Sequence, residues 1–373
     1  MRVLHFYKTY LPNTIGGTEQ VINQLCRGAE GLGVTSEVLS LSPTKVDETV
    51  EVDGHLVHRC HSNFEIASTP FSLSAFFRLR KLAKSADIIH YHFPYPFTDV
   101  LHLLLRIKKP TLVTYHSDII KQKTLLKLYK PLMYKFLNSV DQIVATSPNY
   151  LKTSDVLRKF NNKVSIIPIG LDKRTYPLSV PERTHYWKQR FGKRFFLFVG
   201  VIRYYKGLHI LVEAARNSKY PIVIVGAGQI ETELKEHANK LGVKNIFFLG
   251  RLSDSEKVAL LELSYAVVFP SHLRSEAFGI SLLEGAMYGK PLISSEIGTG
   301  TTYININKKT GVVVPPSDPI ALRNAMDYLW DNPQEAVAMG KRAEERYWQL
   351  FTAKQMLESY VALYKKLIND YKK

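Results

Sequence analysis

Three scarcities limit what this chain of 373 residues can be. It has only two cysteines, Cys26 and Cys60, too few for a disulfide framework, and this agrees with a reducing cytoplasm. No apolar run approaches the roughly 18 residues that a membrane-spanning helix needs. The first residues, MRVLHFYKTYLP, lack the apolar segment of a signal peptide. We therefore expect a soluble, cytoplasmic, globular protein.

Acidic residues are also scarce relative to basic ones. The chain has 33 aspartates and glutamates against 50 lysines and arginines, which gives a net charge of +17. Such a charge indicates a polyanionic partner, which could be nucleic acid, an anionic membrane surface or a phosphorylated substrate. No recognised nucleic-acid-binding motif accompanies the charge, so we expect no nucleic-acid partner. A non-enzymatic binder of membranes or nucleic acid remains the alternative from another functional class.

The hydrophobic pattern alternates between short strands and helices and divides into two halves of similar size. A polar stretch, 171–187, contains two prolines and is interpreted as a connector. The pattern predicts an α/β protein with two doubly wound parallel sheets, in domains 1–170 and 171–354. Such domains bind ligands at the carboxyl ends of their strands. The strands are expected at 2–7, 36–42, 86–92, 111–117, 141–147 and 164–170, and then at 195–200, 220–228, 245–250, 265–271, 290–295 and 311–316.

Two loops after predicted strands have features that suit phosphate. Gly16 and Gly17 follow the first strand and open a helix, where the backbone can approach an anion closely. Arg203 and Lys206 follow the strand at 195–200 and precede another helix, which suits a diphosphate. A tight turn in the first case and a solvated loop in the second are the alternatives.

The stretch SEAFGISLLEGAMYGKP, 275–291, places two glutamates around the start of a short helix. Glu276 precedes the helix and Glu284 lies inside it. The free backbone amides near Phe278, Gly279 and Ile280 suit a phosphate, and each carboxylate can accept hydrogen bonds from sugar hydroxyls. The spacing therefore fits a nucleotide diphosphate sugar, although an ordinary solvated helix start would show the same pattern.

These residues resemble a known family over nearly the whole chain. EAFGISLLE is similar to the E-x7-E signature of retaining glycosyltransferases of the GT-B fold, glycosyltransferase family 4. The resemblance implies two Rossmann-like domains that face each other across a cleft. GTGTTYIN, 298–305, looks most like bacterial transferases of O-antigen and exopolysaccharide synthesis. Six further elements occur in the family's order: GGTE, TYHSD, IIPIGLD, YYKG, GRLSDSEK and TGVVVPPSD.

The resemblance assigns roles to the residues around the second glutamate. Glu284 would bind the ribose hydroxyls of the donor, and Glu276 would contact the transferred sugar. Lys206 would neutralise the diphosphate. Backbone amides for the sugar and the diphosphate would come from Phe278, Gly279 and Ile280.

The family also implies residues elsewhere in the chain. Gly17 would lie under the β-phosphate, and His116 would lie at the reacting centre. Arg251 and Leu252 fall in the loop that borders the base. His90 and His92 end a strand as H-Y-H and are interpreted as core or acceptor-cleft residues rather than metal ligands.

The chain departs from the family pattern at one position and agrees with it in a notable absence. Val201 stands where the family commonly has arginine directly after the strand glycine, and Arg203 is the candidate substitute. No D-x-D triplet occurs anywhere in the chain, which agrees with a scheme without metal or other cofactor. Lys206 and helix N-termini would then hold the leaving group. By resemblance we expect front-side transfer with retention of configuration.

Basic residues are concentrated in the first half of the chain. Eight lysines and arginines but one aspartate lie between Arg106 and Lys135. On a helical wheel Leu125, Leu128, Leu132 and Phe136 share one face. Opposite them we predict a basic surface for anionic lipid or a polyprenyl diphosphate. The surface residues are Lys123, Lys127 and Lys130.

Together these features predict a retaining hexosyltransferase at the inner face of the cytoplasmic membrane. It would move mannose from GDP-mannose to a lipid-linked saccharide in surface polysaccharide synthesis. By family analogy the final helix, about 355–373, would pack back on the first domain. A transferase that uses a UDP-sugar is the alternative closest to this function. A phosphorylase or a nucleotide-sugar epimerase of the same fold are more distant ones.

Overall fold

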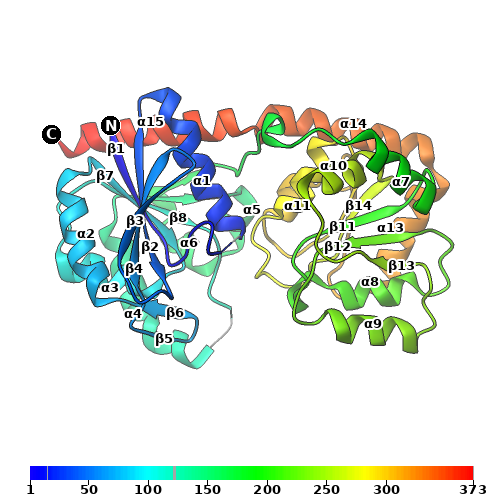
Figure 1. The fold of residues 1–373 in the computed structure, drawn as a ribbon, viewed down its shortest axis with the longest axis horizontal. Helices are drawn as coiled ribbons and strands as arrows, with labels where there is room; N and C mark the ends of the chain where they lie inside the picture. Colours follow the sequence, from blue (N-terminus) through cyan, green and yellow to red (C-terminus); the bar gives the residue numbers. More distant parts are fainter. Residues whose placement is uncertain (15, 121–122, 373) are drawn as a thin grey trace. The chain divides into compact units, whose positions relative to one another are not determined.

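The computed structural model describes residues 1–14, 16–120 and 123–372, without the side chains of residues 123 and 124. The chain divides into two compact units, and each has a central sheet with helices on its two faces (Figure 1). Unit 1 comprises Met1–Ile169 together with Ala353–Lys373, and unit 2 comprises Gly170–Thr352. The sequence had placed this division between residues 170 and 171.

The sheet of unit 1 has the strand order β10-β9-β8-β7-β1-β2-β4-β3. Neighbouring strands are parallel except β3 and β4, which pair antiparallel. The strands are β1 (Arg2–Phe6), β2 (Thr35–Ser42), β3 (Glu48–Val52), β4 (His55–His61), β7 (Ile88–Phe93), β8 (Thr111–Tyr115), β9 (Gln142–Ala145) and β10 (Val164–Ile166). A separate small hairpin pairs β5 (Phe64–Ile66) with β6 (Thr69–Phe71).

Central strands of this sheet are buried on both faces, as continuous apolar runs predict. Strand β7 is the exception in composition, because the buried run IIHYHF includes two histidines. The sequence analysis missed β3 and β4. Strand β3 at the sheet edge, ETVEV, alternates partly exposed and exposed residues, so it offered no buried run to recognise.

Helices of unit 1 include one from the far end of the chain. Helix α15 packs beside α1, where a Cβ on Gly28 would lie 2.3 Å from Leu357 Cδ1, so glycine permits the close approach (Figure 1). The helices are α1 (Gly17–Ala29), α2 (Leu73–Ser85), α3 (Pro96–Leu105), α4 (Lys123–Ser139), α5 (Pro148–Thr153), α6 (Asp155–Lys159) and α15 (Ala353–Tyr371).

Unit 2 is built on a parallel sheet with the order β13-β12-β11-β14-β15-β16. The order reverses at β11, which pairs with β12 on one side and with β14 on the other. Loops at such a switch point form the usual ligand crevice of a Rossmann-like domain. The strands are β11 (Phe196–Val199), β12 (Ile222–Val225), β13 (Ile246–Phe248), β14 (Ala266–Phe269), β15 (Leu292–Ser295) and β16 (Gly311–Val314).

The predicted connector of unit 2 was partly wrong, because α7 begins within it. Pro181 occupies the first turn of α7, where its missing N–H costs nothing, and Trp187 and Phe191 bury the inner face of the helix. The helices are α7 (Pro181–Phe191), α8 (Leu208–Ala215), α9 (Glu231–Lys240), α10 (Asp254–Leu263), α11 (Ile280–Met287), α12 (Thr301–Ile304), α13 (Pro319–Asp331) and α14 (Pro333–Leu350). Among the described residues, no helix has both the length and the apolar composition to cross a bilayer.

Candidate active site

An ion pair lies beyond the carboxyl ends of β11 and β14 in unit 2. The loop after β11 supplies Lys206, and the loop after β14 supplies Glu276. Lys206 Nζ donates to Glu276 Oε2, and each side chain is only 11% exposed. Ser271 Oγ donates to the same oxygen at 3.4 Å. The structure thus brings together two residues that the sequence assigned to the diphosphate and to the transferred sugar.

Burial of this ion pair costs desolvation free energy that the pair alone does not fully offset. Two charges removed from water need further hydrogen bonds on their remaining protons and lone pairs. Lys206 Nζ has three protons and lies 4.7 Å from the centre of the Phe269 ring, an apolar neighbour. Glu276 Oε1 has no hydrogen-bond partner among the described residues. An ammonium and a carboxylate with unused capacity can take a phosphate and a hydroxyl, respectively.

Helix α11 begins beside this ion pair, at the position that the sequence predicted. Gly279 caps it with φ 98°, a conformation that favours glycine, and no side chain caps the helix. Phe278 is buried, and Ile280 is the first helical residue. The uncapped amides of this first turn and the positive end of the helix dipole therefore suit an anion.

Glu284 is held inside α11 by two side chains that the sequence analysis did not identify. Its Oε1 accepts from Tyr176 Oη at 3.0 Å and from Lys257 Nζ at 3.1 Å. Only 5% of Glu284 is exposed. Burial alone would lower the pKa of Lys257, but the carboxylates of Glu284 and Asp254 outweigh it and raise that pKa. Both contacts use one oxygen, so Oε2 keeps its lone pairs for a ligand.

Tyr176 and Lys257 both lie in segments that the sequence analysis described. Tyr176 lies in the stretch that was interpreted as a connector, and Lys257 ends the quoted motif GRLSDSEK. Burial raises the pKa of Tyr176, and the Glu284 carboxylate raises it further, so Tyr176 remains a donor at neutral pH. The sequence did not show that Tyr176 contacts Glu284, because the two residues are 108 positions apart.

The other predicted donor residues of unit 2 lie on loops. Arg203 is exposed and precedes the turn that contains Lys206, and Val201 is 45% exposed. Arg251 is exposed and Leu252 is half-buried, between β13 and α10. Among the described residues, neither arginine makes an ion pair. Their side chains are therefore available to a ligand.

The glycine pair of unit 1 is at the start of α1. Gly16 is the residue before the helix, Gly17 is its first residue, and no side chain caps it. Glu19, which the sequence analysis did not single out, is buried and accepts hydrogen bonds from Thr9 Oγ1 at 2.8 Å and Thr14 Oγ1 at 3.1 Å. These bonds tie the loop before the helix to the first turn of α1.

His116 follows β8 directly and is fixed at its backbone and its ring. Its N–H donates to Phe93 O at 2.9 Å, and its Nε2 lies 3.0 Å from His92 Nδ1. Burial lowers the pKa of His116 to about 4. The ring is therefore neutral at physiological pH, with one nitrogen that donates and one that accepts.

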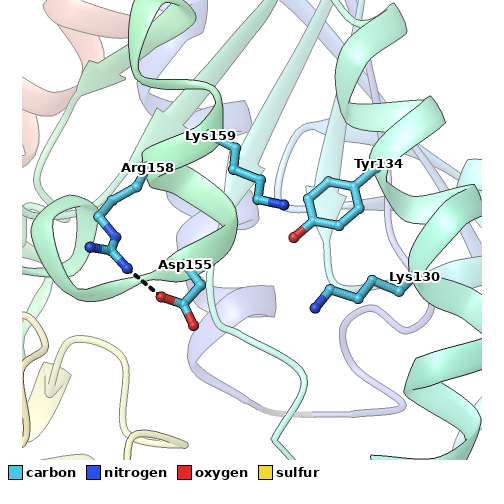
Figure 2. Close-up of a pocket in the computed structure, with 5 residues that line it drawn as sticks. All are labelled: Lys130, Tyr134, Asp155, Arg158 and Lys159. Carbon is cyan, nitrogen blue, oxygen red and sulfur yellow. Dashed lines mark hydrogen bonds and ion pairs between the residues drawn. The ribbon is translucent and has the colours of Figure 1, made fainter.

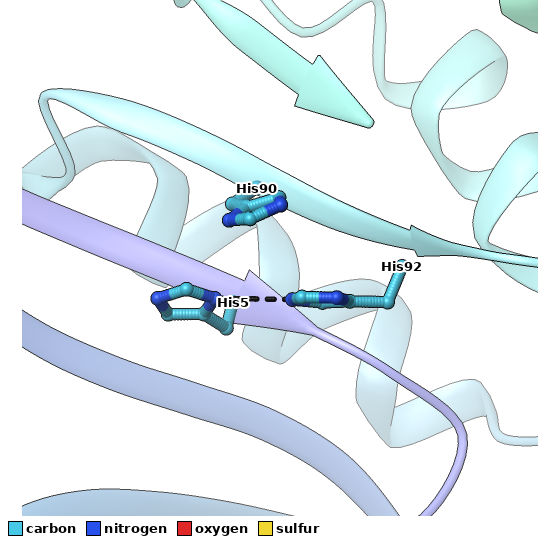
Figure 3. Close-up of side chains that lie close together, drawn as sticks. All are labelled: His5, His90 and His92. Carbon is cyan, nitrogen blue, oxygen red and sulfur yellow. Dashed lines mark hydrogen bonds between the residues drawn. The ribbon is translucent and has the colours of Figure 1, made fainter. Parts of the chain in front are cut away.

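His116, which is half-buried, contacts a group of buried histidines in unit 1. Figure 3 shows His5 from β1 beside His90 and His92 from β7. His5 Nδ1 lies 3.1 Å from His92 Nε2. His90 instead contacts hydroxyls, with Nδ1 at 2.7 Å from Tyr364 Oη and Nε2 at 2.7 Å from Thr114 Oγ1. Burial lowers the pKa of each of these three rings.

The residues of the predicted basic surface belong to α4. Lys127 and Lys130 are exposed, whereas the side chain of Lys123 lies outside the described part of the structure. Leu125 and Leu128, which the wheel placed on the face opposite the lysines, are 48% and 79% exposed. The residues that α4 buries are Met133, Phe136 and Leu137 in its second half, so its first half has little of unit 1 to pack against.

A surface hollow of about 410 Å³ lies between α4 and α6 (Figure 2). Lys130 and Lys159 extend toward the Tyr134 ring, and Lys159 Nζ is 4.7 Å from the ring centre. Arg158 pairs with Asp155 at 2.5 Å. The hollow has three cations and one carboxylate, so it carries a net positive charge.

Comparison with known proteins agrees with this architecture. The profile described as glycosyltransferase family 4 matches residues 15–174, and that of the glycosyl transferases group 1 matches residues 183–346. D-rhamnosyltransferase WbpZ of Pseudomonas aeruginosa is 60% identical over 95% of this chain and 93% of its own. O-antigen chain mannosyltransferase C of Escherichia coli is 50% identical over 99% of this chain and 100% of its own.

Solved structures with distant sequences share the fold. Sucrose-phosphate synthase from Thermosynechococcus elongatus superposes with a TM-score of 0.80 at 20% identity, over 99% of both chains. Anabaena HepE in complex with UDP gives a TM-score of 0.78 at 16% identity, over 98% of this chain and 100% of the other. With two Rossmann-like units, both family profiles and relatives of 50–60% identity, the chain belongs to glycosyltransferase family 4 and is a glycosyltransferase of the GT-B fold.

Proposed function

We propose that this glycosyltransferase moves mannose from GDP-mannose to a lipid-linked saccharide acceptor, with retention of configuration, in the synthesis of a bacterial O-antigen or surface polysaccharide. The observation that carries the proposal is the charged site of unit 2, in which Lys206, Glu276 and Glu284 surround the start of α11. The two similar relatives are named for D-rhamnosyl and mannosyl transfer, which supports the sugar class.

In this proposal unit 2 holds the donor. Glu284 Oε2 accepts from the ribose hydroxyls, while Tyr176 and Lys257 keep the carboxylate in place. The amides at the start of α11 and the ammonium of Lys206 hold the diphosphate, with Arg203 as a further cation. Glu276 accepts from hydroxyls of the transferred sugar. The loop of Arg251 and Leu252 borders the base.

The leaving group is stabilised by positive charge that is fixed in advance. Charge develops on the departing β-phosphate, and Lys206 and the helix N-terminus lie where they can offset it without reorganisation. Protein cations thereby take the role that a metal ion has in other transferases, and we propose that no metal is needed. The departing phosphate oxygen takes the acceptor proton on the face from which it leaves, so configuration is retained.

Unit 1 binds the acceptor in this proposal. Gly16 and Gly17 at the start of α1 approach the donor phosphate, and the neutral ring of His116 hydrogen-bonds at the reacting centre. An acceptor with a polyprenyl diphosphate requires an anion-binding surface near a membrane. The exposed lysines of α4 and the basic hollow beside Tyr134 have the charge for it, and Leu128 has the exposed apolar surface. The protein would then be peripheral on the inner face of the cytoplasmic membrane.

A second donor is favoured by one comparison. The relative at 60% identity is named a D-rhamnosyltransferase, and D-rhamnose is the 6-deoxy form of mannose. The two donors differ only in the hydroxyl at C6. A site that hydrogen-bonds that hydroxyl rejects the deoxy sugar strongly, because its polar groups would otherwise lose their partner.

The test is transfer by the purified full chain to a short lipid-linked acceptor. GDP-mannose, its 6-deoxy counterpart and UDP-glucose are supplied separately, with a chelator present, and the anomeric configuration of the product is read by NMR. We expect transfer from GDP-mannose with an α-linked product. Transfer only from the deoxy sugar would change the donor, and transfer only from UDP-glucose would reject the guanosine assignment. A β-linked product would reject retention.

A further inference from the structure

The side chains of His5, His92 and His116 in unit 1 form a continuous row, in which His5 and His92 are buried and His116 is half-buried. His5 Nδ1 lies 3.1 Å from His92 Nε2, and His92 Nδ1 lies 3.0 Å from His116 Nε2. The ring planes of His5 and His92 differ by only 22° and those of His92 and His116 by 21°, with ring centres 5.4 and 5.2 Å apart, so the rings of each pair lie edge to edge and nearly in one plane. His92 thus uses both ring nitrogens on other histidines. His116 Nδ1, at the end of the row, makes no hydrogen bond within the described residues.

Strand register explains why the row forms. In adjacent parallel strands, alternate side chains share one face. His5 and His90 are partners in register on β1 and β7, and His92 follows two positions later. His92 in turn pairs with Thr114 of β8, and His116 follows that residue by two. The sequence places four histidines on one face of the sheet, where helix α15 covers part of them through Tyr360 and Tyr364.

The three rings of the row are limited to the neutral protonation state. Burial lowers the pKa of His116 to about 4 and that of His5 to about 3, and it holds that of His92 well below the usual value. All three rings are therefore neutral at pH 7, and each has one N–H and one bare nitrogen. A hydrogen bond between two imidazoles needs one of each.

Only two proton arrangements satisfy both hydrogen bonds. In one, every ring carries its proton on Nε2, and the bonds run from His116 through His92 to His5. In the other, every ring carries its proton on Nδ1, and the bonds run in the opposite direction. A ring that differs from the other two would set two protons or two lone pairs against each other.

We propose that His5 and His92 are positioning residues that couple the tautomer of His116 to their own, so that Nδ1 of His116 changes between donor and acceptor only when the whole row changes. This inference rests on the proposed role of His116 at the reacting centre. A change of state would move one proton across each of the two hydrogen bonds, and the three rings stay neutral only if His116 Nδ1 gains a proton from outside the row as His5 Nε2 loses one. No charge is stored, because a cation in this buried row is disfavoured.

A metal site is the competing interpretation of the same side chains. One ring nitrogen from each of His5, His90 and His92 lies within 4.8 Å of the others. However, His90 directs both nitrogens to hydroxyl groups. The rings of His90 and His92 are also stacked, with centres 4.3 Å apart, so their in-plane lone pairs do not converge on a point between them. Figure 3 shows this stacked arrangement.

The row can be tested in the free protein by NMR of the ring nitrogens. The full chain has 12 histidines, few enough for selective ¹⁵N labelling and for assignment by single substitutions. At pH 7 we expect His5, His92 and His116 to be neutral and to carry the proton on the same type of nitrogen. A mixed set of tautomers would overturn the proposal, and so would chelator-sensitive zinc bound at one equivalent. None of these results depends on the donor or acceptor.

Substitution of the central histidine separates positioning from packing. In His92→Phe, His116 Nε2 loses its partner, so its tautomers should interconvert and its two ring nitrogens give averaged signals. His92→Asn keeps a polar group near the position of Nδ1 and should restore a defined tautomer in part. His90→Phe is the matched control, because His90 is equally buried and stacked but outside the row. An unchanged His116 in His92→Phe, or a changed one in His90→Phe, would overturn the proposal.

Kinetics of the same variants connect the row to the reaction. We expect His92→Phe to lower kcat by about 10- to 100-fold with little change in the donor KM, a loss below that for removal of His116 itself. His92→Asn should recover part of it. Folding of each variant is checked by thermal unfolding. Equal kcat in His92→Phe and wild type, with His116 averaged by NMR, would show that the tautomer does not matter for transfer.

Discussion

The two units use different polar groups at their candidate sites. Unit 1 buries neutral imidazoles and hydroxyls on one face of its sheet, as in the bonds of His90 to Thr114 and Tyr364. Unit 2 buries charges, in the pairs Lys206–Glu276 and Lys257–Glu284. Neutral hydrogen bonds give direction at little desolvation cost, whereas buried charges act strongly on a charged ligand.

This difference corresponds to the two tasks of the proposed reaction. A diphosphate leaving group needs fixed positive charge, which the lysines of the ion pairs in unit 2 supply. A hydroxyl acceptor is neutral and needs an oriented partner, which a neutral histidine such as His116 can be.

Removal of the Lys206 charge should have the largest effect. We expect Lys206→Ala to lower kcat by at least about 10²- to 10³-fold, because the leaving group loses a fixed cation. Lys290→Ala is the control, since Lys290 is also half-buried in unit 2 but donates to a backbone carbonyl, Glu262 O, at 2.7 Å. Steady-state kinetics with saturating donor measure both.

Lys206→Ala also leaves the Glu276 carboxylate buried without its cation, which could destabilise unit 2 by itself. The double variant Lys206→Met with Glu276→Gln removes both charges and retains the approximate volume. If it folds like wild type and stays inactive, the loss is catalytic. Wild-type kcat in either variant would show that unit 2 does not act through this charge.

Acid should destabilise unit 1 before unit 2. The pKa of His116 is lowered to about 4 by burial, so between pH 6.5 and 4 the unfolded chain takes up a proton that the folded chain refuses. Stability from this group is complete above pH 6.5 and falls as pH decreases, by roughly 3 kcal/mol at pH 4. His5, with a pKa of about 3, adds to the loss. Hydrogen exchange at several pH values shows which strands lose stability on acidification.

Equal loss of stability in both units on acidification would contradict this prediction. Strands β1 and β7, which carry the histidines, should lose protection first, while β11 and β14 should keep theirs. His116→Gln should flatten the pH dependence by about one proton, because one group that titrates differently in the two states is gone.

Loss of the Glu284 charge should weaken donor binding more than it slows chemistry. Glu284→Gln keeps the shape of the side chain but replaces charged hydrogen bonds, each worth about 1.5–3 kcal/mol, with weaker ones. We expect the donor KM to rise by about 10- to 100-fold, with a smaller change in kcat. Tyr176→Phe removes one group that holds Glu284 and should give a smaller rise. A kcat effect larger than the KM effect would place Glu284 at the reacting centre instead.

The exposed side chain of Leu128 on α4 should contribute to membrane binding but not to the stability of the fold. Leu128→Asn should change stability by at most about 0.5 kcal/mol, because Leu128 is 79% exposed. It should weaken sedimentation with anionic phospholipid vesicles by about tenfold, since a buried leucine contributes about 1.5–3 kcal/mol. Leu178→Asn is the control, at 89% exposure in unit 2. Equal vesicle binding in both variants would contradict a membrane role for α4.

Much of the fold could be predicted from sequence because the strands bury continuous apolar runs. The expected helix after Gly279 begins at Ile280 as predicted, since glycine at φ 98° marks its start locally. Strand β3 was missed because its partly exposed edge carries no such run. The exposure of Leu125 and Leu128 could not be predicted, because a helical wheel shows which residues share a face but not how far the rest of the unit extends beneath it.

For the site, local pattern identified the residues but not their partners. Lys206 and Glu276 were placed by the strand ends that carry them, yet their ion pair joins positions 70 residues apart. Tyr176 was overlooked because a polar stretch with prolines resembles a plain connector. The histidine row depends on the register of three strands, which no single segment encodes.

The most direct test of the central claim is thermal unfolding of the full chain with GDP, UDP and ADP, in the wild type and in the double variant Lys206→Met with Glu276→Gln. A nucleotide at about 100 times its Kd adds about 2.7 kcal/mol, enough to raise Tm by degrees. We predict a shift of the wild type with GDP and a much smaller one in the double variant. Equal shifts in both proteins, or none with any nucleotide, would contradict the assignment of the charged site in unit 2 to a nucleotide diphosphate.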